Sequence, residues 1–136
     1  MTLEVRQIGP KCMPRIFPQV AGFIEQGLAP SNDINVNQAK DLISTGNWQL
    51  FAVFNEEKVI KGAYVTTIND SPTGKIAVII SAAGKGLAGQ EPFEQLCKIF
   101  KGFGATKVQA LANDAATRLY SRVGLNKKAN FVEKKL

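Results

Sequence analysis

The pattern of apolar and polar positions divides the chain into strand-like and helix-like segments. Residues 3–8 alternate between apolar and polar side chains, which is typical of a half-buried strand. Residues 49–54 and 59–68 are rich in apolar and β-branched side chains and are joined by a polar turn, so they predict two consecutive strands. Residues 76–80, the run IAVII, are continuously apolar, which favours a central strand covered on both faces.

Apolar positions spaced three and four residues apart predict helices elsewhere. One helix starts with Pro18 in its first turn and stops at Gly27, and a second covers 35–44. A third opens with Pro92 and ends at Gly104. The side chains that this third helix is expected to bury are Phe93, Leu96, Cys97, Phe100 and Phe103.

The C-terminal stretch NDAATRLYSRVGL, residues 113–125, predicts a fourth helix. Asn113 or Asp114 can cap its start, and Gly124 can end it in a left-handed turn. Its apolar stripe consists of Ala116, Leu119, Tyr120 and Val123. Tyr120 within that stripe has two interpretations, since it can fill the core or carry chemistry through its hydroxyl.

Strands at 107–112 and 130–135 complete the predicted order β-α-α-β-β-β-α-β-α-β. The turn NDSPTG, residues 69–74, separates the third and fourth strands. This order predicts a mixed α/β (α+β) fold with one mostly antiparallel sheet and helices on both faces. A length of 136 residues favours a single domain over residues 1–136.

Composition narrows the setting and the chemistry. Apolar residues make up 45% of the chain and no apolar run approaches the roughly 20 residues that a membrane helix needs, so no membrane partner is expected. The N-terminus does not resemble a signal peptide, and a cytoplasmic location is predicted. The net charge of +6 fits an anionic partner such as nucleic acid, a phosphorylated cofactor or an acidic surface.

The chain contains no histidine and two cysteines, Cys12 and Cys97. A four-ligand zinc site and a catalytic set that contains histidine are therefore excluded, and no metal is predicted. Acid–base chemistry would fall to carboxylates, tyrosine, lysine or a held water. Cys97 lies on the apolar face of its helix and is interpreted as a core residue rather than a nucleophile.

The segment AAGKGLAGQEP, residues 82–92, lies between a buried strand and a helix N-terminus. Glycines allow the backbone to approach a ligand, and the first amides of a helix attract anions, so a phosphate or pyrophosphate site is one interpretation. A flexible glycine-rich connection is the other. The segment is neither a Walker A loop nor a complete G-x-G-x-x-G fingerprint.

Two segments resemble the GNAT superfamily of acyl-CoA-dependent N-acetyltransferases. The residues of 113–125 that match the family's C-terminal motif are Asn113, Ala115, Ala116, Leu119, Tyr120, Gly124 and Leu125. Gly84, Gly86 and Ala88 resemble the small residues of its pyrophosphate loop. Where the family usually has Gln or Arg before the glycines, this chain has Ala83, or Ser81 in a shifted register. Compact phage-encoded GNAT-like proteins share that departure, and this chain is similar to them in style.

The resemblance implies an acetyl-CoA site and an amine acceptor, either a small molecule or a protein. Backbone groups of Ile79, Ile80 and Ser81 would contact the pantetheine, and Asn113 would contact the cofactor. Tyr120 would be the general acid that protonates the departing CoA thiolate. The residues whose amides or charge would hold the pyrophosphate are Gly84, Lys85, Gly86, Leu87 and Ala88.

Two other functions stay open. One is a GNAT-shaped protein without catalysis that acts as a structural or interaction module, for instance with a protein partner in a phage particle, where its location would be the virion. The absence of a convincing general base supports that alternative. The carboxylates that could act as a base are candidates only by elimination, and they are Glu56, Glu57, Glu91 and Asp114. The other is nucleic-acid binding, which the scarcity of aromatics outside core positions makes the least favoured. Its basic candidates are Lys98, Lys101, Lys107, Arg118, Arg122, Lys127 and Lys128.

Overall fold

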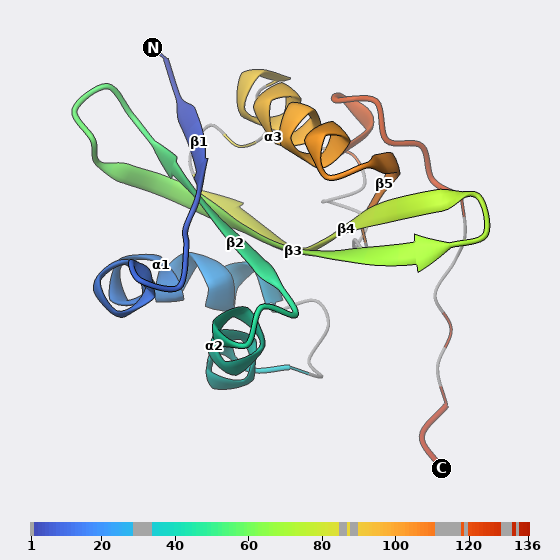
Figure 1. Cartoon of the computed structure of the whole chain (residues 1–136), viewed down its shortest axis with the longest axis horizontal. Helices are drawn as coiled ribbons and strands as arrows, with labels where there is room; N and C mark the ends of the chain where they lie inside the picture. Colours follow the sequence, from blue (N-terminus) through green and yellow to red (C-terminus); the bar gives the residue numbers. More distant parts are fainter. Residues whose placement is uncertain are drawn as a thin grey trace.

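A computed structural model of the chain describes residues 2–28, 34–84, 87, 90–110, 118, 120–128, 132 and 134–136 (Figure 1). Its elements in chain order are β1 (Glu4–Gln7), α1 (Met13–Leu28), α2 (Val36–Ser44), β2 (Gln49–Phe54), β3 (Ile60–Ser71), β4 (Gly74–Gly84), α3 (Gln90–Gly102) and β5 (Ala105–Ala110). These elements reproduce the first eight of the predicted order, so the mixed fold with strands and helices interleaved is confirmed.

One twisted sheet organises the molecule. Its five strands lie in the order β1-β2-β3-β4-β5. Neighbouring strands are antiparallel except β4 and β5, which run parallel because α3 connects them as a crossover. Helices α1 and α2 cover one face and α3 covers the other (Figure 1). Each face of the sheet therefore has its own apolar core.

Helix α1 differs most from its prediction. It begins at Met13, five residues before Pro18, so that Pro14 lies in the first turn and Pro18 lies inside the helix. An interior proline costs about 3 kcal/mol. Burial of one large apolar side chain contributes roughly 1.5–3 kcal/mol, and α1 buries six, which outweighs that cost. The six are Met13, Ile16, Phe17, Val20, Ile24 and Leu28.

The β3–β4 hairpin is longer than the sequence predicted. Pairing continues out to Ser71 and Gly74, which leaves only Pro72 and Thr73 in the turn. At its other end β4 extends through Ala82 and Ala83 to Gly84, so these residues belong to the strand and not to the glycine-rich loop. Backbone pairing with β3 extends the strand here, although its small side chains gave no strand signal.

Helices α2 and α3 lie where the apolar spacing predicted them. Asn35 and Gln38 form a reciprocal capping box at the start of α2, and Gly46 with φ +84° follows its end. In α3, Phe93, Leu96 and Phe100 are buried as expected. Phe103 is 36% exposed, because it follows the last helical residue and leaves the stripe.

The predicted C-terminal helix is partly described. Arg118, Tyr120 and Ser121 are helical, and Gly124 has the predicted left-handed conformation, with φ +98°. The amide of Leu125 donates to the carbonyl of Tyr120 (3.1 Å) and the amide of Gly124 donates to that of Ser121 (3.3 Å), which together form a Schellman motif.

The predicted final strand at 130–135 is not found among its described residues. Val132, Lys134 and Lys135 lie in no strand, and Val132 is 86% exposed. A short alternating pattern does not make a strand without a sheet edge that pairs with it. The described C-terminal end lies away from the sheet (Figure 1).

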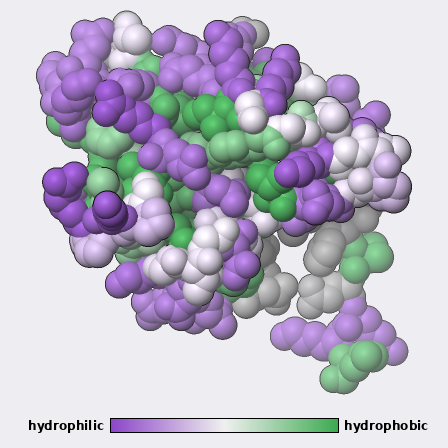
Figure 2. Space-filling model, viewed as in Figure 1, coloured by the Kyte–Doolittle hydropathy of each residue, from purple (hydrophilic) through white to green (hydrophobic). Residues whose placement is uncertain are grey.

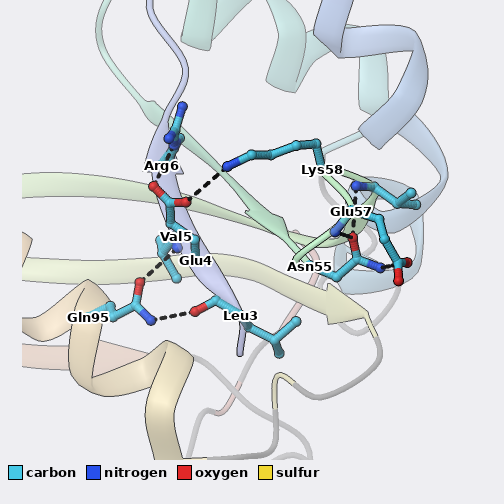
Figure 3. Close-up of polar contacts among 9 residues, drawn as sticks. Leu3, Glu4, Val5, Arg6, Asn55, Glu57, Lys58 and Gln95 are labelled. Carbon is cyan, nitrogen blue, oxygen red and sulfur yellow. Dashed lines mark hydrogen bonds and ion pairs between the residues drawn. The ribbon is translucent and has the colours of Figure 1, made fainter. Parts of the chain in front are cut away.

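A glutamine of α3 covers the outer edge of the sheet at β1. Gln95 donates to the carbonyl of Leu3 (2.6 Å) and accepts from the amide of Val5 (2.9 Å), as Figure 3 shows. Backbone groups at a sheet edge otherwise invite pairing with another chain. Gln95 therefore both fixes α3 on the sheet and blocks part of this edge.

The surface is mostly polar (Figure 2). Among the described residues, the large apolar side chains that are exposed are Val59, Phe103, Val132 and Leu136. They come from the β2–β3 turn, the end of α3 and the C-terminal segment. No helix in the described part of the chain is long and apolar enough to cross a membrane.

Candidate functional site

The pairing of the parallel strands β4 and β5 that the structure describes covers only part of the length of β4. Its last register pair is Ile79 with Ala110, the last described residue of β5. Strand β4 continues for five more residues to Gly84, held on its other side by β3. Beyond Ile79, the edge of β4 that faced β5 therefore has no strand partner within the described part of the chain. Backbone amides and carbonyls on such an edge can bind an extended ligand.

A β-bulge lies directly after the last described pair between β4 and β5. Val65 pairs with Ser81 and Thr66 pairs with Ile79, so Ile80 is the extra residue in β4. Ile79 packs into the core under α3, whereas Ile80 packs against the core on the α1 side. Bulges bend a strand and interrupt its ladder, which changes the direction of the backbone groups around Ile80. The sequence gave no sign of this bulge, because IAVIIS reads as an uninterrupted apolar run.

The side chain of Ser81 is used for packing. It is 2% exposed, and its hydroxyl donates to the carbonyl of Ile24 in α1 (3.3 Å). A Cβ at Gly27 would lie 2.0 Å from Ser81 Oγ and 2.8 Å from the amide nitrogen of Ala82. Gly27 therefore does not stop the helix, as the sequence suggested, but lets α1 lie directly on β4.

The backbone around Gly84 requires a glycine at this position. Its φ is +138°, and a Cβ there would lie 2.3 Å from the carbonyl oxygen of Lys61 and 2.4 Å from Gly62 Cα. Leu87, which follows in the loop, packs partly buried against the α3-side core, and its Cδ1 would lie 3.1 Å from a Cβ at Gly62. The strands β3 and β4 thus fix the start of the glycine-rich loop, and α3 begins at Gln90 shortly afterwards.

Tyr120 lies against the α3-side core, which it contacts as a half-buried side chain. Burial raises the pKa of its phenol. The hydroxyl is therefore protonated at neutral pH, as a proton donor must be. Because Tyr120 is only half-buried, it can pack against the core and still expose part of its side chain. Core filling and chemistry through its hydroxyl are therefore compatible.

A second tyrosine, which the sequence analysis missed, belongs to the same core. Tyr64 of β3 is 1% exposed, and its hydroxyl has no hydrogen-bond partner, the only such buried side-chain atom in the described residues. Burial is the main cause that raises its pKa, followed by the proximity of Tyr120 and then of Cys97. The only sequence signal was a tyrosine in the middle of a strand whose neighbouring residues, Gly62, Ala63, Val65 and Thr66, are small or β-branched.

The remaining candidates separate into core and surface. Cys97 is half-buried in the α3-side core and burial raises the pKa of its thiol, which supports its interpretation as a core residue. Glu56 accepts from the amide of Thr2, Glu57 lies in the β2–β3 turn beside Asn55 (Figure 3), and Glu91 is exposed. In the described part of the chain, no contact joins any of these three carboxylates to Tyr120.

Several predicted site residues lie outside the described residues. Asp114 among the candidate bases is one of them. The predicted cofactor contacts in this group are Lys85, Gly86, Ala88 and Asn113. Their roles stay predictions. The predicted contacts that are described, Ile79, Ile80, Ser81, Gly84 and Leu87, all lie along the end of β4 and the loop that follows it.

Comparison with known proteins gives a likeness of fold. No protein-family model and no curated protein matches the sequence. An aminoglycoside acetyltransferase from an uncultured soil metagenomic sample, in complex with sisomicin, matches with a TM-score of 0.72 at 16% identity, over 98% of this chain and 95% of that chain. Glucosamine-6-phosphate N-acetyltransferase from Arabidopsis thaliana matches with a TM-score of 0.63 at 18% identity, over 99% of both chains.

A third similar structure is a "predicted acetyltransferase with acetyl-CoA" from Clostridium acetobutylicum, with a TM-score of 0.68 at 13% identity, over 98% of this chain and 96% of that chain. At these identities the likeness shows the fold alone. The chain has the GNAT fold, as its sequence predicted. The similarity in style to phage-encoded members finds no support in these comparisons, and the predicted cytoplasmic or virion location stays a prediction.

Proposed function

We propose that this protein is an acetyl-CoA-dependent N-acetyltransferase. The observation that supports it most is the bulge at Ile80 in β4, directly after Ile79–Ala110, the last pair between β4 and β5 in the described residues. A bulge takes backbone groups out of the strand ladder, and groups of this kind fit an extended amide-containing chain such as pantetheine. The glycine-rich loop and the start of α3 follow at the end of the same strand, where the predicted site for the pyrophosphate lies.

Within this proposal, the strand edge orients the co-substrate and Tyr120 moves a proton. The nitrogen of the acceptor amine attacks the thioester carbonyl carbon, the carbon–sulfur bond breaks, and the Tyr120 hydroxyl gives its proton to the sulfur. The amine nitrogen loses one proton to water, and Tyr120 regains its own from solvent. A held water or an amine that arrives neutral can take the place of a protein base, and Asp114, which lies outside the described residues, stays a candidate base.

The first experiment is isothermal titration calorimetry with acetyl-CoA on the wild type and three variants. Gly86→Glu introduces a carboxylate into the predicted pyrophosphate loop. Gly22→Glu is its matched control, since Gly22 is exposed on α1 and a Cβ there meets nothing within 4 Å. Tyr120→Phe removes the proposed acid but no proposed binding contact. Micromolar binding should be lost in Gly86→Glu and kept in the other two variants.

The same titration tests the principal alternative, a GNAT-shaped protein without catalysis. Absence of binding at millimolar acetyl-CoA would overturn the enzyme proposal and favour that alternative. If acetyl-CoA binds, release of the CoA thiol in the presence of a panel of amines would follow. Tyr120→Phe should then lower kcat by roughly 10²–10⁴-fold, the usual contribution of general acid catalysis.

A further inference from the structure

The hydroxyl of Tyr64 is an unexplained polar group in an otherwise apolar core. It is buried and has no hydrogen-bond partner in the described residues. A buried polar group without a partner is destabilising, and a phenylalanine of the same shape would avoid that loss. A tyrosine at this position therefore suggests that its hydroxyl has a function, which a phenylalanine could not provide.

Tyr64 lies beside the last residues of β4. On β4 it is paired with Ala82, three positions beyond Ile79, the last residue of β4 that pairs with β5 in the described part of the chain. Ala82 carries only a methyl group, so the Tyr64 ring meets little bulk on the neighbouring strand. Tyr120 and Cys97 pack against the core cluster that contains Tyr64, from the C-terminal helix and from α3.

The two phenols differ in how readily they lose a proton. Burial raises the pKa of both, but Tyr64 is almost fully enclosed and Tyr120 only half-buried. The charge of an ionised Tyr120 raises the pKa of Tyr64 further. When Tyr120 becomes a phenolate, Tyr64 thus still carries its proton and can donate it in a hydrogen bond. The other titratable neighbour, Cys97, has a raised pKa and lies next to Lys101 and Glu94 on α3.

Resting on the proposed acetyl transfer, we propose that Tyr64 is a positioning residue for Tyr120. Its hydroxyl, which has no partner among the described residues, would donate a hydrogen bond through one water to the Tyr120 oxygen as that oxygen gives its proton to the CoA sulfur. Burial alone makes Tyr120 a weaker acid than a free phenol, which opposes this transfer. A donor aimed at the phenolate offsets that effect, because hydrogen bonds to a charged acceptor are the stronger class.

The composition of the chain makes this inference testable without turnover. Tyr64 and Tyr120 are its only two tyrosines. The near-ultraviolet absorbance of tyrosinate then reports Tyr120 alone in Tyr64→Phe and Tyr64 alone in Tyr120→Phe. In the wild type the first ionisation should belong to Tyr120, with a midpoint about one pH unit below that of Tyr64→Phe, a tenfold difference in acidity. Cys97→Ala, which removes the other titratable neighbour, should leave the first midpoint unchanged.

Far-ultraviolet circular dichroism at each pH would confirm that the variants stay folded during the titration. A midpoint in Tyr64→Phe equal to or below the first wild-type midpoint would overturn the inference. In the catalytic assay, Tyr64→Phe should lower kcat about tenfold with KM for acetyl-CoA retained, and the alkaline limb of the kcat profile should move to higher pH. A fixed alkaline limb would show that Tyr64 only fills the core.

The two proposals fail separately. Coupled phenols in a protein that does not bind acetyl-CoA would overturn the proposed function, and the catalytic role of Tyr64 with it. Uncoupled phenols in a protein that binds and transfers acetyl groups would overturn only the role given to Tyr64.

Discussion

Gly62 and Gly84 lie opposite each other on β3 and β4, and neither has room for a side chain. A Cβ at Gly84 would lie 2.4 Å from Gly62 Cα, and a Cβ at Gly62 would lie 2.7 Å from the carbonyl oxygen of Ala83. All of these neighbours are backbone atoms, which cannot move aside as a flexible side chain can. This contact fixes where the last strand before the glycine-rich loop ends.

The first prediction concerns Gly84→Ala. Its φ of +138° and the backbone contacts above should make this variant less stable by about 1–3 kcal/mol. Urea unfolding measures the change. Gly22→Ala is the control, because its Cβ would meet nothing within 4 Å in the middle of α1 and should be neutral or stabilising by about 0.5–1 kcal/mol. Equal stability of Gly84→Ala and the wild type would contradict the close approach of the two strands.

The second prediction concerns the contact between α1 and β4. Gly27→Ala places a Cβ 2.0 Å from Ser81 Oγ and 2.8 Å from the amide nitrogen of Ala82, so overpacking should cost about 1–3 kcal/mol. Adding Ser81→Ala removes the nearest atom but leaves the backbone of Ala82. A double-mutant cycle by urea unfolding should therefore show partial recovery. Strictly additive effects would mean that the two residues do not touch.

The third prediction concerns Gln95, which joins α3 to the edge strand. Gln95→Leu removes both of its backbone hydrogen bonds, to Leu3 and Val5, and should cost about 1–3 kcal/mol. Hydrogen exchange at the Val5 amide should accelerate as well. Gln19→Leu is the matched control, since Gln19 is exposed and makes one local bond to the carbonyl of Arg15, so it should change stability by less than about 0.5 kcal/mol. Unchanged Val5 exchange in Gln95→Leu would argue against this edge contact.

The fourth prediction is a loss of stability in alkali. Burial raises the pKa of Tyr64 in the folded chain, whereas in the unfolded chain it returns to about 10. Above that pH the unfolded state binds fewer protons than the folded state, so the free energy of unfolding falls as pH rises. The fall is roughly 1.4 kcal/mol per pH unit for a tyrosine that stays fully protonated. Below pH 10 this contribution to stability is fully present.

Urea unfolding of the wild type and Tyr64→Phe at several pH values above and below 10 would measure this effect. Tyr64→Phe should lose stability less steeply than the wild type, because only Tyr120 and Cys97 remain as buried groups with raised pKa values. Its stability at neutral pH should be equal or higher, since the buried hydroxyl without a partner is gone. Identical slopes in the two proteins would show that Tyr64 titrates normally in the fold.

Local pattern was sufficient for most of the elements. Strand 49–54 and the helix that follows Asn35 lie where the sequence placed them, because side-chain period and capping chemistry are properties of neighbouring residues. The same holds for Gly124, whose left-handed turn ends an amphipathic stretch. The motif that points to the GNAT fold is also local. The sequence therefore determined the fold class, the order of the described elements and the region of the candidate site.

Contacts between distant segments decided the rest. Gly27 resembles a helix stop until Ser81, from another element, is placed against it, and Gly84 resembles a loop glycine until it meets Gly62. The early start of α1, with Pro18 inside it, follows from the six apolar side chains that it buries. The bulge at Ile80 and the shared core of Tyr64 and Tyr120 depend on strand register, and no period along a single chain records register. The sequence by itself thus determined the fold class and most of the elements, whereas the tertiary structure decided the register of the strands and which second phenol packs into the same core as Tyr120, because both depend on contacts between distant segments.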